Sequence, residues 1–170
     1  MPEPLVLLPG MMCDERLFSP QIAALSAERE VHVLPLTSHD TVELLAETIL
    51  EQAPPRFALA GLSMGGIVAM EVIRQAPHRV TRLALLDTNP LAERVEVSAN
   101  REVQIAKVRK GQLREIMSEE MKPCYLSDGP NKAAILDVCM DMAESLGPQV
   151  FEQQSRALQS RPDQQNTLRG

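Results

Sequence analysis

The first ninety residues of the chain alternate short, continuously apolar runs with segments of helical periodicity. The apolar runs are Leu5–Leu8, Val31–Leu36, Phe57–Leu62 and Val80–Leu86. Strands that are apolar along their whole length, separated by helices of about ten residues, indicate parallel pairing with both faces of the sheet covered. We therefore expect an α/β fold with an open, doubly wound, mostly parallel sheet, which binds ligands beyond the carboxyl ends of its strands.

Helix-start signals lie between these runs. Ser19 followed by a proline is typical of an N-cap and predicts a helix that ends at about Leu25. Asp40, with a glutamate three residues later, predicts the cap of a second, amphipathic helix, which a Pro-Pro pair ends. The segment Ile67–Ala76 is apolar nearly all round, which predicts a buried helix.

The character of the chain changes after Pro90, where no further strand is apparent. We expect residues 1–90 to form the core and residues 91–160 to form an appended helical cap or lid. Apolar stripes at helical spacing run over residues 113–121 and 135–146, and Gly147-Pro148 separates the second stripe from a last helix at about Gln149–Gln159. The polar tail 161–170 has no predicted element, and we expect it to lead into a further core segment.

Composition excludes several kinds of partner and compartment. The chain has 170 residues, a net charge of −6, one tyrosine, three phenylalanines and no tryptophan, whereas nucleic-acid readers need basic surfaces and stacking platforms. No apolar run approaches the roughly 18 residues of a membrane span. A secretory signal requires a positively charged residue before its apolar stretch, and no Lys or Arg precedes the apolar N-terminal stretch of this chain. Cys13, Cys124 and Cys139 form neither a disulfide framework nor a zinc pattern, so we expect a reduced, cytoplasmic protein.

The sharpest motif is Gly61-Leu62-Ser63-Met64-Gly65-Gly66, which lies between an apolar strand and an apolar helix. G-x-S-x-G is typical of a nucleophile elbow, in which a strained strand-to-helix turn pushes the serine hydroxyl out of the backbone. Glycine two residues before and after the serine removes a Cβ that would meet the neighbouring strands. The helix N-terminus adds partial positive charge where an oxyanion would develop. The alternative is a glycine-rich turn that only packs the helix against the sheet.

A second turn, Pro9-Gly10-Met11-Met12, ends the first strand. Acyl-transfer sites need two N–H donors for the tetrahedral oxyanion, one from the residue after the nucleophile and one from a loop such as this. The two donors would be the backbone N–H groups of Met64 and Met11. By itself, Pro-Gly after a strand is also an ordinary turn.

Three segments, LLPGMMCDERLF, FALAGLSMGGIVAMEV and LALLDTNP, resemble the α/β-hydrolase superfamily, in its branch of small esterases and lipid or thioester hydrolases with a helical cap. The resemblance is specific over residues 5–90, extends loosely to Asp163 and corresponds to the N-terminal two-thirds of such a hydrolase. It implies Ser63 as the nucleophile, with Met11 and Met64 as the oxyanion donors. Pro9 stands where many relatives carry histidine, a variant that keeps the backbone donor.

The general base of a catalytic triad has no well-placed candidate, because the three histidines of the chain all come early. His32 lies within a strand, and His78 follows the elbow helix at the end of the sheet away from the site. His39 follows the second strand, and the strand order of the superfamily that the chain resembles would leave it on the wrong side of Ser63. Asp87 ends the fourth strand, where some hydrolases of the superfamily take their acid; alternatively, it bonds its own turn. In relatives the histidine comes from sequence beyond the cap, and so, in most of them, does the acid.

The leading hypothesis is a serine hydrolase that cleaves a small-molecule carboxylic ester or thioester through an acyl-Ser63 intermediate, with no organic cofactor or metal. Without its base such an enzyme loses about 10⁶ in turnover, so we expect this chain alone to be inactive, as a truncated or split form. The fourth strand is expected to be an exposed apolar edge, which favours pairing with a C-terminal segment or a second copy. The alternatives are a non-catalytic ligand-binding or partner-docking relative and an acyltransferase.

Other chemistry-bearing residues have simpler interpretations. Cys13, near the oxyanion loop, is expected to be a small packed residue rather than a reactive thiol. The acidic pairs at 14–15 and 119–120 are expected to be solvated charges rather than metal ligands. Met117, Met121, Met140 and Met142 either line an acyl pocket, since methionine adapts to flexible ligands, or pack in the core.

Overall fold

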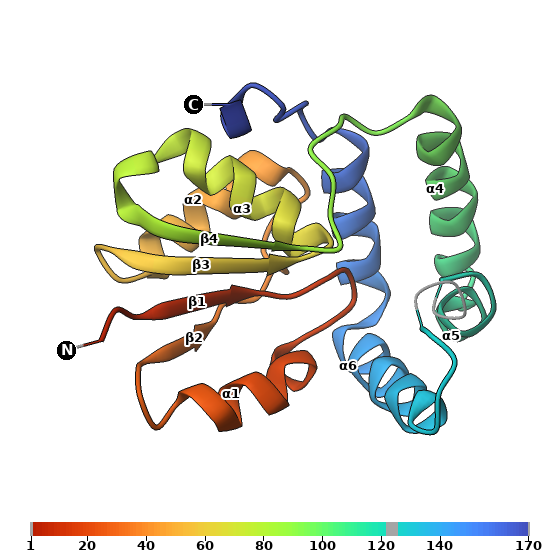
Figure 1. The fold of residues 1–170 in the computed structure, drawn as a ribbon. Helices are drawn as coiled ribbons and strands as arrows, with labels where there is room; N and C mark the ends of the chain where they lie inside the picture. Colours follow the sequence, from red (N-terminus) through yellow and green to blue (C-terminus); the bar gives the residue numbers. More distant parts are fainter. Residues whose placement is uncertain (1, 122–125, 170) are drawn as a thin grey trace.

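The computed structural model describes residues 2–121 and 126–169. Its four strands form one parallel sheet in the order β2-β1-β3-β4 (Figure 1): β1 (Leu5–Leu8), β2 (Val31–Val33), β3 (Phe57–Leu62) and β4 (Val80–Leu86). The predicted parallel sheet is confirmed, and β1, β3 and β4 have the predicted bounds. The prediction that the second strand reaches residue 36 is wrong. Leu34 makes the last bond, from its N–H to the carbonyl of Leu7, and Pro35 has no N–H to continue the ladder.

Helices cover both faces of this sheet, as predicted for a doubly wound arrangement. Figure 1 shows α2 (Val42–Gln52) and α3 (Met64–Gln75) on one face and α1 (Ser19–Leu25) on the other. The α1 face buries a small cluster of Leu7, Phe18 and Ala60. The opposite face belongs to the large core, in which Phe57 is fully buried. Continuously apolar strands are the expected consequence, because a strand covered on both faces has no side that water reaches.

Two predicted helix caps are wrong, although both helices form. A 3-10 helix, Glu15–Phe18, runs directly into α1, so Phe18 occupies the cap position and Asp14 caps the 3-10 helix by accepting from the N–H of Arg16. Thr41, rather than Asp40, caps α2: its hydroxyl oxygen accepts from the N–H of Leu44 at 3.3 Å. Thr41 has the extended backbone (φ −131°, ψ 147°) that a capping residue needs.

The second half of the chain is helical. It comprises α4 (Val95–Val108), α5 (Leu113–Glu115), a π-helical turn (Ile116–Met121) and α6 (Lys132–Gln159), and residues 91–121 and 126–169 contain no strand, as predicted. The two parts of α6 meet at the predicted Gly147-Pro148 break, where Gly147 has a φ of 80° that favours glycine. Figure 1 shows α6 across the carboxyl ends of the strands, with α4 beyond it.

The prediction that the tail has no element of its own is wrong. Residues Thr167–Arg169 form a 3-10 turn that packs against α3, and Gln164 is 1% exposed. The Gln164 side chain donates to the carboxylate of Glu71 on α3 at 2.6 Å, and its N–H donates to the carbonyl of Pro90 at 2.7 Å. Glu71 is fully buried, so its carboxylate needs donors, and the tail supplies one of them.

The outer edge of the sheet is β4. Among residues 2–121 and 126–169, no strand pairs with its far side, and Leu83 and Leu86 are 37% and 43% exposed. The predicted exposed apolar edge is confirmed. Within this described part of the chain, none of the helices has the length and apolar character that crossing a bilayer requires.

Candidate active site

The turn between β3 and α3 has the geometry of a nucleophile elbow. Ser63 connects the two elements with φ 52° and ψ −112°, a left-handed backbone that costs a non-glycine residue energy. The neighbouring turn after β4 holds it there: the N–H of Ser63 donates to the carbonyl of Leu86, and the Thr88 hydroxyl donates to the carbonyl of Ser63, each at 2.8 Å. Ser63 itself is exposed, while Met64 beside it is buried. The strained turn therefore presents the serine to solvent.

Close packing explains all three glycines of the motif. A Cβ on Gly65 would lie 2.0 Å from the carbonyl oxygen of Leu8, at the end of β1, as expected for a neighbouring strand. A Cβ on Gly61 would instead meet the backbone of Gly65, at 2.3 Å, so the prediction that a strand crowds this position is wrong. A Cβ on Gly66 would lie 2.6 Å from the Thr88 side chain. The elbow is thus wedged between β1 and the turn that follows β4.

The loop after β1 is held by a hydrogen bond to α6. Met12 has a φ of 55° and is fully buried, and its N–H donates to the side-chain oxygen of Gln154 on α6 at 2.8 Å. The Gln154 amide then donates to the carbonyl of Leu36 at 2.9 Å. Among the described residues the N–H of Met11 has no acceptor. The first N–H of a helix, here that of Met64, has no intrahelical acceptor either.

The four residues that the sequence predicted for the site line one cavity of about 310 Å³. Ser63, Met64, Met11 and Asp87 all line it. The rest of its lining is mostly apolar with two arginines: Gly10, Cys13, Leu17, Leu62, Ile67, Thr88, Asn89, Arg101, Met121, Leu126, Ile135, Cys139, Leu158 and Arg161. A concave, mostly apolar hollow with a few convergent polar groups is the usual form of a small-molecule site.

Asp87 follows β4 directly, with a φ of 44°, and lies in the same cavity as the serine. The bond across its turn is made by Asn89, whose side chain accepts from the N–H of Leu91, while Thr88 bonds Ser63. Among the described residues, the Asp87 side chain itself makes no hydrogen bond in this turn. Asp87 remains a candidate acid by position alone.

The three histidines lie away from this cavity. His32 is on β2 and His39 follows it, and β1 separates β2 from β3 in the sheet. His78 lies in the 3-10 turn Pro77–Arg79, which precedes β4 and so sits at the opposite end of the sheet. None of the three lines the cavity.

Cys13, Cys139 and Met121 each line the cavity and also pack in a buried apolar cluster. Cys13 is buried, as predicted for a packed residue, in a cluster with Cys139 and Met142; Cys124 lies outside the described residues. Of the four methionines that were candidates for an acyl pocket, Met121 lines the cavity, whereas Met117 and Met140 pack in the main core.

Four residues with a part in the site carry no sequence signal of their own: Thr88, Gln154, Arg101 and Arg161. Thr88 was visible only as part of a turn. The others lie in the helical second half of the chain and at the start of the tail, 38 to 98 positions after Ser63, where no motif marks them. Only the folded chain brings them to the elbow.

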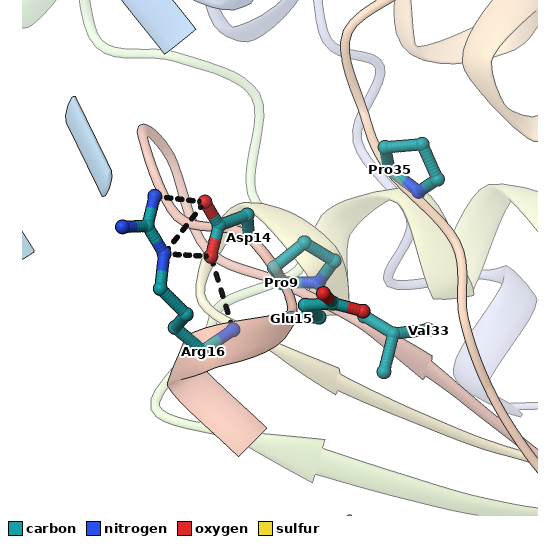
Figure 2. Close-up of a pocket in the computed structure, with 6 residues that line it drawn as sticks. All are labelled: Pro9, Asp14, Glu15, Arg16, Val33 and Pro35. Atoms are coloured by element: carbon teal, nitrogen blue, oxygen red, sulfur yellow. Dashed lines mark hydrogen bonds and ion pairs between the residues drawn. The ribbon is translucent and has the colours of Figure 1, made fainter. Parts of the chain in front are cut away.

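A second hollow, of about 430 Å³, lies at the start of the first helical segment (Figure 2). It is lined by Pro9, Asp14, Glu15, Arg16, Val33 and Pro35. Figure 2 shows Arg16 turned onto Asp14, at 2.6 Å, and hydrogen bonds from Arg16 hold the pKa of Asp14 below its ordinary value. The charges of Asp14 and Arg16 therefore satisfy each other, and Glu15 is the third charged residue of the lining. The hollow is larger than the cavity at the elbow, but it contains no nucleophile, so we place the candidate active site at Ser63.

The four-stranded parallel sheet, the serine at its elbow and the helices across its strand ends define the class: the chain has the α/β-hydrolase fold. Three solved structures resemble it. A thermophilic esterase from Thermogutta terrifontis has a TM-score of 0.84 and 24% identity, over 98% of this chain and 66% of that one. A hydrolase from Pseudomonas aeruginosa PA01 has a TM-score of 0.77 and 19% identity, over 94% of this chain and 65% of that one. The enol-lactonase from Burkholderia xenovorans LB400 has a TM-score of 0.74 and 18% identity, over 96% of this chain and 67% of that one.

Comparison with curated proteins finds relatives of similar sequence. The pimeloyl-[acyl-carrier protein] methyl ester esterase of Nitrosomonas europaea is 30% identical over 94 residues, which are 51% of this chain and 37% of that protein. The protein of the same name from Aromatoleum aromaticum is 32% identical over 93 residues, again 51% and 37%. The aligned stretch spans little more than a third of these relatives. No family model matches the chain.

Proposed function

We propose that this chain carries the nucleophile and the oxyanion hole of a serine hydrolase that acts on carboxylic esters or thioesters. The observation that carries the proposal is the left-handed, exposed Ser63 at the strand-to-helix turn, in one cavity with Met11 and Met64. The similarity to methyl ester esterases supports an ester substrate. Two backbone N–H groups beside the serine that have no acceptor among the described residues are further support.

In the proposed reaction, the Ser63 hydroxyl oxygen attacks the carbonyl carbon and loses its proton to a base. The negative charge that develops on the carbonyl oxygen is held by the N–H groups of Met64 and Met11. The carbonyl carbon then expels its alcohol or thiol, leaving acyl-Ser63, which water hydrolyses to the carboxylic acid. Substituting such an oxyanion donor typically lowers turnover by about 10²–10³.

We further propose that the base is none of the three histidines, and that another polypeptide segment supplies it. His32 and His39 belong to β2 and the loop after it, and His78 to the opposite end of the sheet. Asp87, in the cavity, is the proposed acid that would orient such a base. The same lack of a base favours the second candidate, a ligand-binding relative that kept the elbow.

Imidazole rescue distinguishes the two functions. The 170-residue chain is assayed with p-nitrophenyl butyrate at rising imidazole, because imidazole can enter an open site and act as the missing base. Imidazole also cleaves this ester unaided, so Ser63→Ala under the same conditions sets the background, and Ser38→Ala, at an exposed serine outside the site, is the matched control.

If the chain is a hydrolase that lacks only its base, its turnover rises with imidazole and exceeds the background rate of Ser63→Ala. Ser38→Ala should then have the same turnover as the unchanged chain. Equal rates for the unchanged chain and Ser63→Ala would reject Ser63 as a nucleophile and favour the binding protein. Serine-dependent turnover without imidazole would reject the second part of the proposal, because the base would then be within the chain.

A further inference from the structure

Two positive charges from distant parts of the chain converge on the cavity at Ser63. Arg101 comes from the middle of α4, and Arg161 from the segment that follows α6. Their side chains are only 14% and 10% exposed. Asp87, at the end of β4, is the third charged residue of the lining.

A single carboxylate holds both guanidinium groups. The same oxygen of Glu93 lies 3.1 Å from the Nε of Arg101 and 3.4 Å from an Nη of Arg161. The Glu93 side chain is 4% exposed and is not part of the cavity lining, so it anchors the arginines from outside the cavity. One negative charge is thus shared between two buried positive charges, an arrangement that costs energy unless a further anion is present.

Each arginine keeps donors to spare. Beyond the contacts with Glu93, Arg161 donates from its Nε to the carbonyl of Leu91 at 2.9 Å, and Arg101 has only the weak acceptor Sδ of Met11, at 3.7 Å from its Nη1. Among the described residues, the Nη2 groups of both arginines have no acceptor.

The environment of Arg161 is short of negative charge. Burial lowers the pKa of its guanidinium from the ordinary value, the charge of Glu93 opposes that shift, and the charge of Arg101 adds to it. An anion in the cavity would offset both the burial and the repulsion between the two arginines.

Both arginines line the same cavity as Ser63, and Arg101 also contacts the loop after β1. Arg101 contacts the side chain of Met11, the residue whose backbone N–H is the proposed oxyanion donor. A cavity of about 310 Å³ is at the small end for ligand sites. A group bound by the arginines would therefore be only a short chain away from a carbonyl at Ser63.

We propose that the substrate carries a carboxylate on its acyl part, which Arg101 and Arg161 bind while its ester group faces Ser63. The substrate class is a half-ester of a small dicarboxylic acid. This inference rests on the proposed function for the role of Ser63, whereas the binding of the carboxylate does not depend on turnover.

Calorimetric titration of the 170-residue chain tests the inference without catalysis. The probes are monomethyl glutarate, which has one carboxylate, and dimethyl glutarate, which has none. We expect the half-ester to bind at least about tenfold more tightly than the diester, and Arg101→Met and Arg161→Met each to weaken the half-ester about tenfold or more, as for a lost charged hydrogen bond. Arg94→Met is the matched control, since Arg94 is exposed and does not line the cavity.

Several results would overturn the inference. Equal affinities for the half-ester and the diester would overturn it. So would affinities of Arg101→Met and Arg161→Met for the half-ester that equal that of Arg94→Met, because the two arginines would then have only a structural role. Tighter binding of inorganic phosphate than of the half-ester would reject the carboxylate. Arg101→Lys, which keeps the charge and the aliphatic stem, should lose less affinity than Arg101→Met and serves if the methionine variant does not fold.

The two proposals fail separately. Arginine-dependent binding together with a negative imidazole experiment would reject the hydrolase but leave the carboxylate site in place. Serine-dependent hydrolysis with no preference for the half-ester would reject only the carboxylate site.

Discussion

Replacing Gly65 by alanine tests the contact that seats the elbow against the sheet. The added Cβ would lie 2.0 Å from the carbonyl oxygen of Leu8, 2.6 Å from its carbon and 2.8 Å from the carbonyl oxygen of Pro9. All three atoms are backbone atoms at the end of the central strand β1, which hydrogen bonds fix on both sides. No side chain can rotate away, so α3 or the end of β1 has to move.

Two opposing effects set the size of the change. Alanine favours a helix over glycine by about 1 kcal/mol, and Gly65 is the second residue of α3. Overpacking costs about 1–3 kcal/mol and sometimes more, and a clash with backbone belongs at or above the upper end. The expected net loss is about 2 kcal/mol or more, which for a chain of this size lowers the melting temperature by roughly 4–8 °C.

Urea unfolding followed by circular dichroism measures this difference. Gly10→Ala is the matched control, because its Cβ would have no contact closer than 3.6 Å and should change the stability by less than about 1 kcal/mol. A Gly65→Ala protein as stable as the unchanged chain would mean that the elbow does not pack against β1 as described.

Three further changes test other parts of the structure. Gln154→Leu leaves the buried N–H of Met12 without its acceptor, so we expect a loss of about 1–3 kcal/mol in urea unfolding and weaker imidazole-dependent hydrolysis; full stability would show that the bond is absent. Burial acts to raise the pKa of Glu71, but hydrogen bonds from Arg74, Gln75 and Gln164 outweigh it and lower that pKa below 4.5. Glu71 therefore contributes stability above pH 4.5 that is lost as the pH falls through the lowered value, and the unfolding free energy of Glu71→Gln should vary less between pH 6 and 3. Ala84→Lys puts a charge on the exposed edge strand β4, so sedimentation velocity should detect less self-association than for the unchanged chain, if the copies pair there.

Much of the sheet and the elbow could be predicted because their signals are local. A continuous apolar run between turn residues fixed the bounds of β3 and β4, and glycine was recognisable at the two positions around Ser63 where a Cβ would clash. The caps were harder. Asp40 and Thr41 are adjacent and both can cap a helix, so only the extended backbone of Thr41 decides between them.

The parts that could not be predicted depend on contacts between distant residues. Met12 and Gln154 are 142 positions apart, and neither has an unusual sequence environment. The chain has 17 lysines and arginines, and nothing in their spacing distinguishes the two that share the buried carboxylate of Glu93. A buried partner of this kind becomes visible only when the burial of each side chain is known.

These long-range contacts change the role expected for the cap. A lid that merely closed over a finished site would leave the core intact without it, yet Gln154 of α6 supplies the acceptor for the buried N–H of Met12. Phe151 of the same helix is fully buried in one cluster with Leu8 of β1 and Met64 of the elbow. Because a buried N–H without an acceptor is costly, the loop beside the proposed oxyanion hole keeps its conformation only while α6 is packed against it. The helical part is therefore as much a support of the reacting geometry as a cover for the substrate.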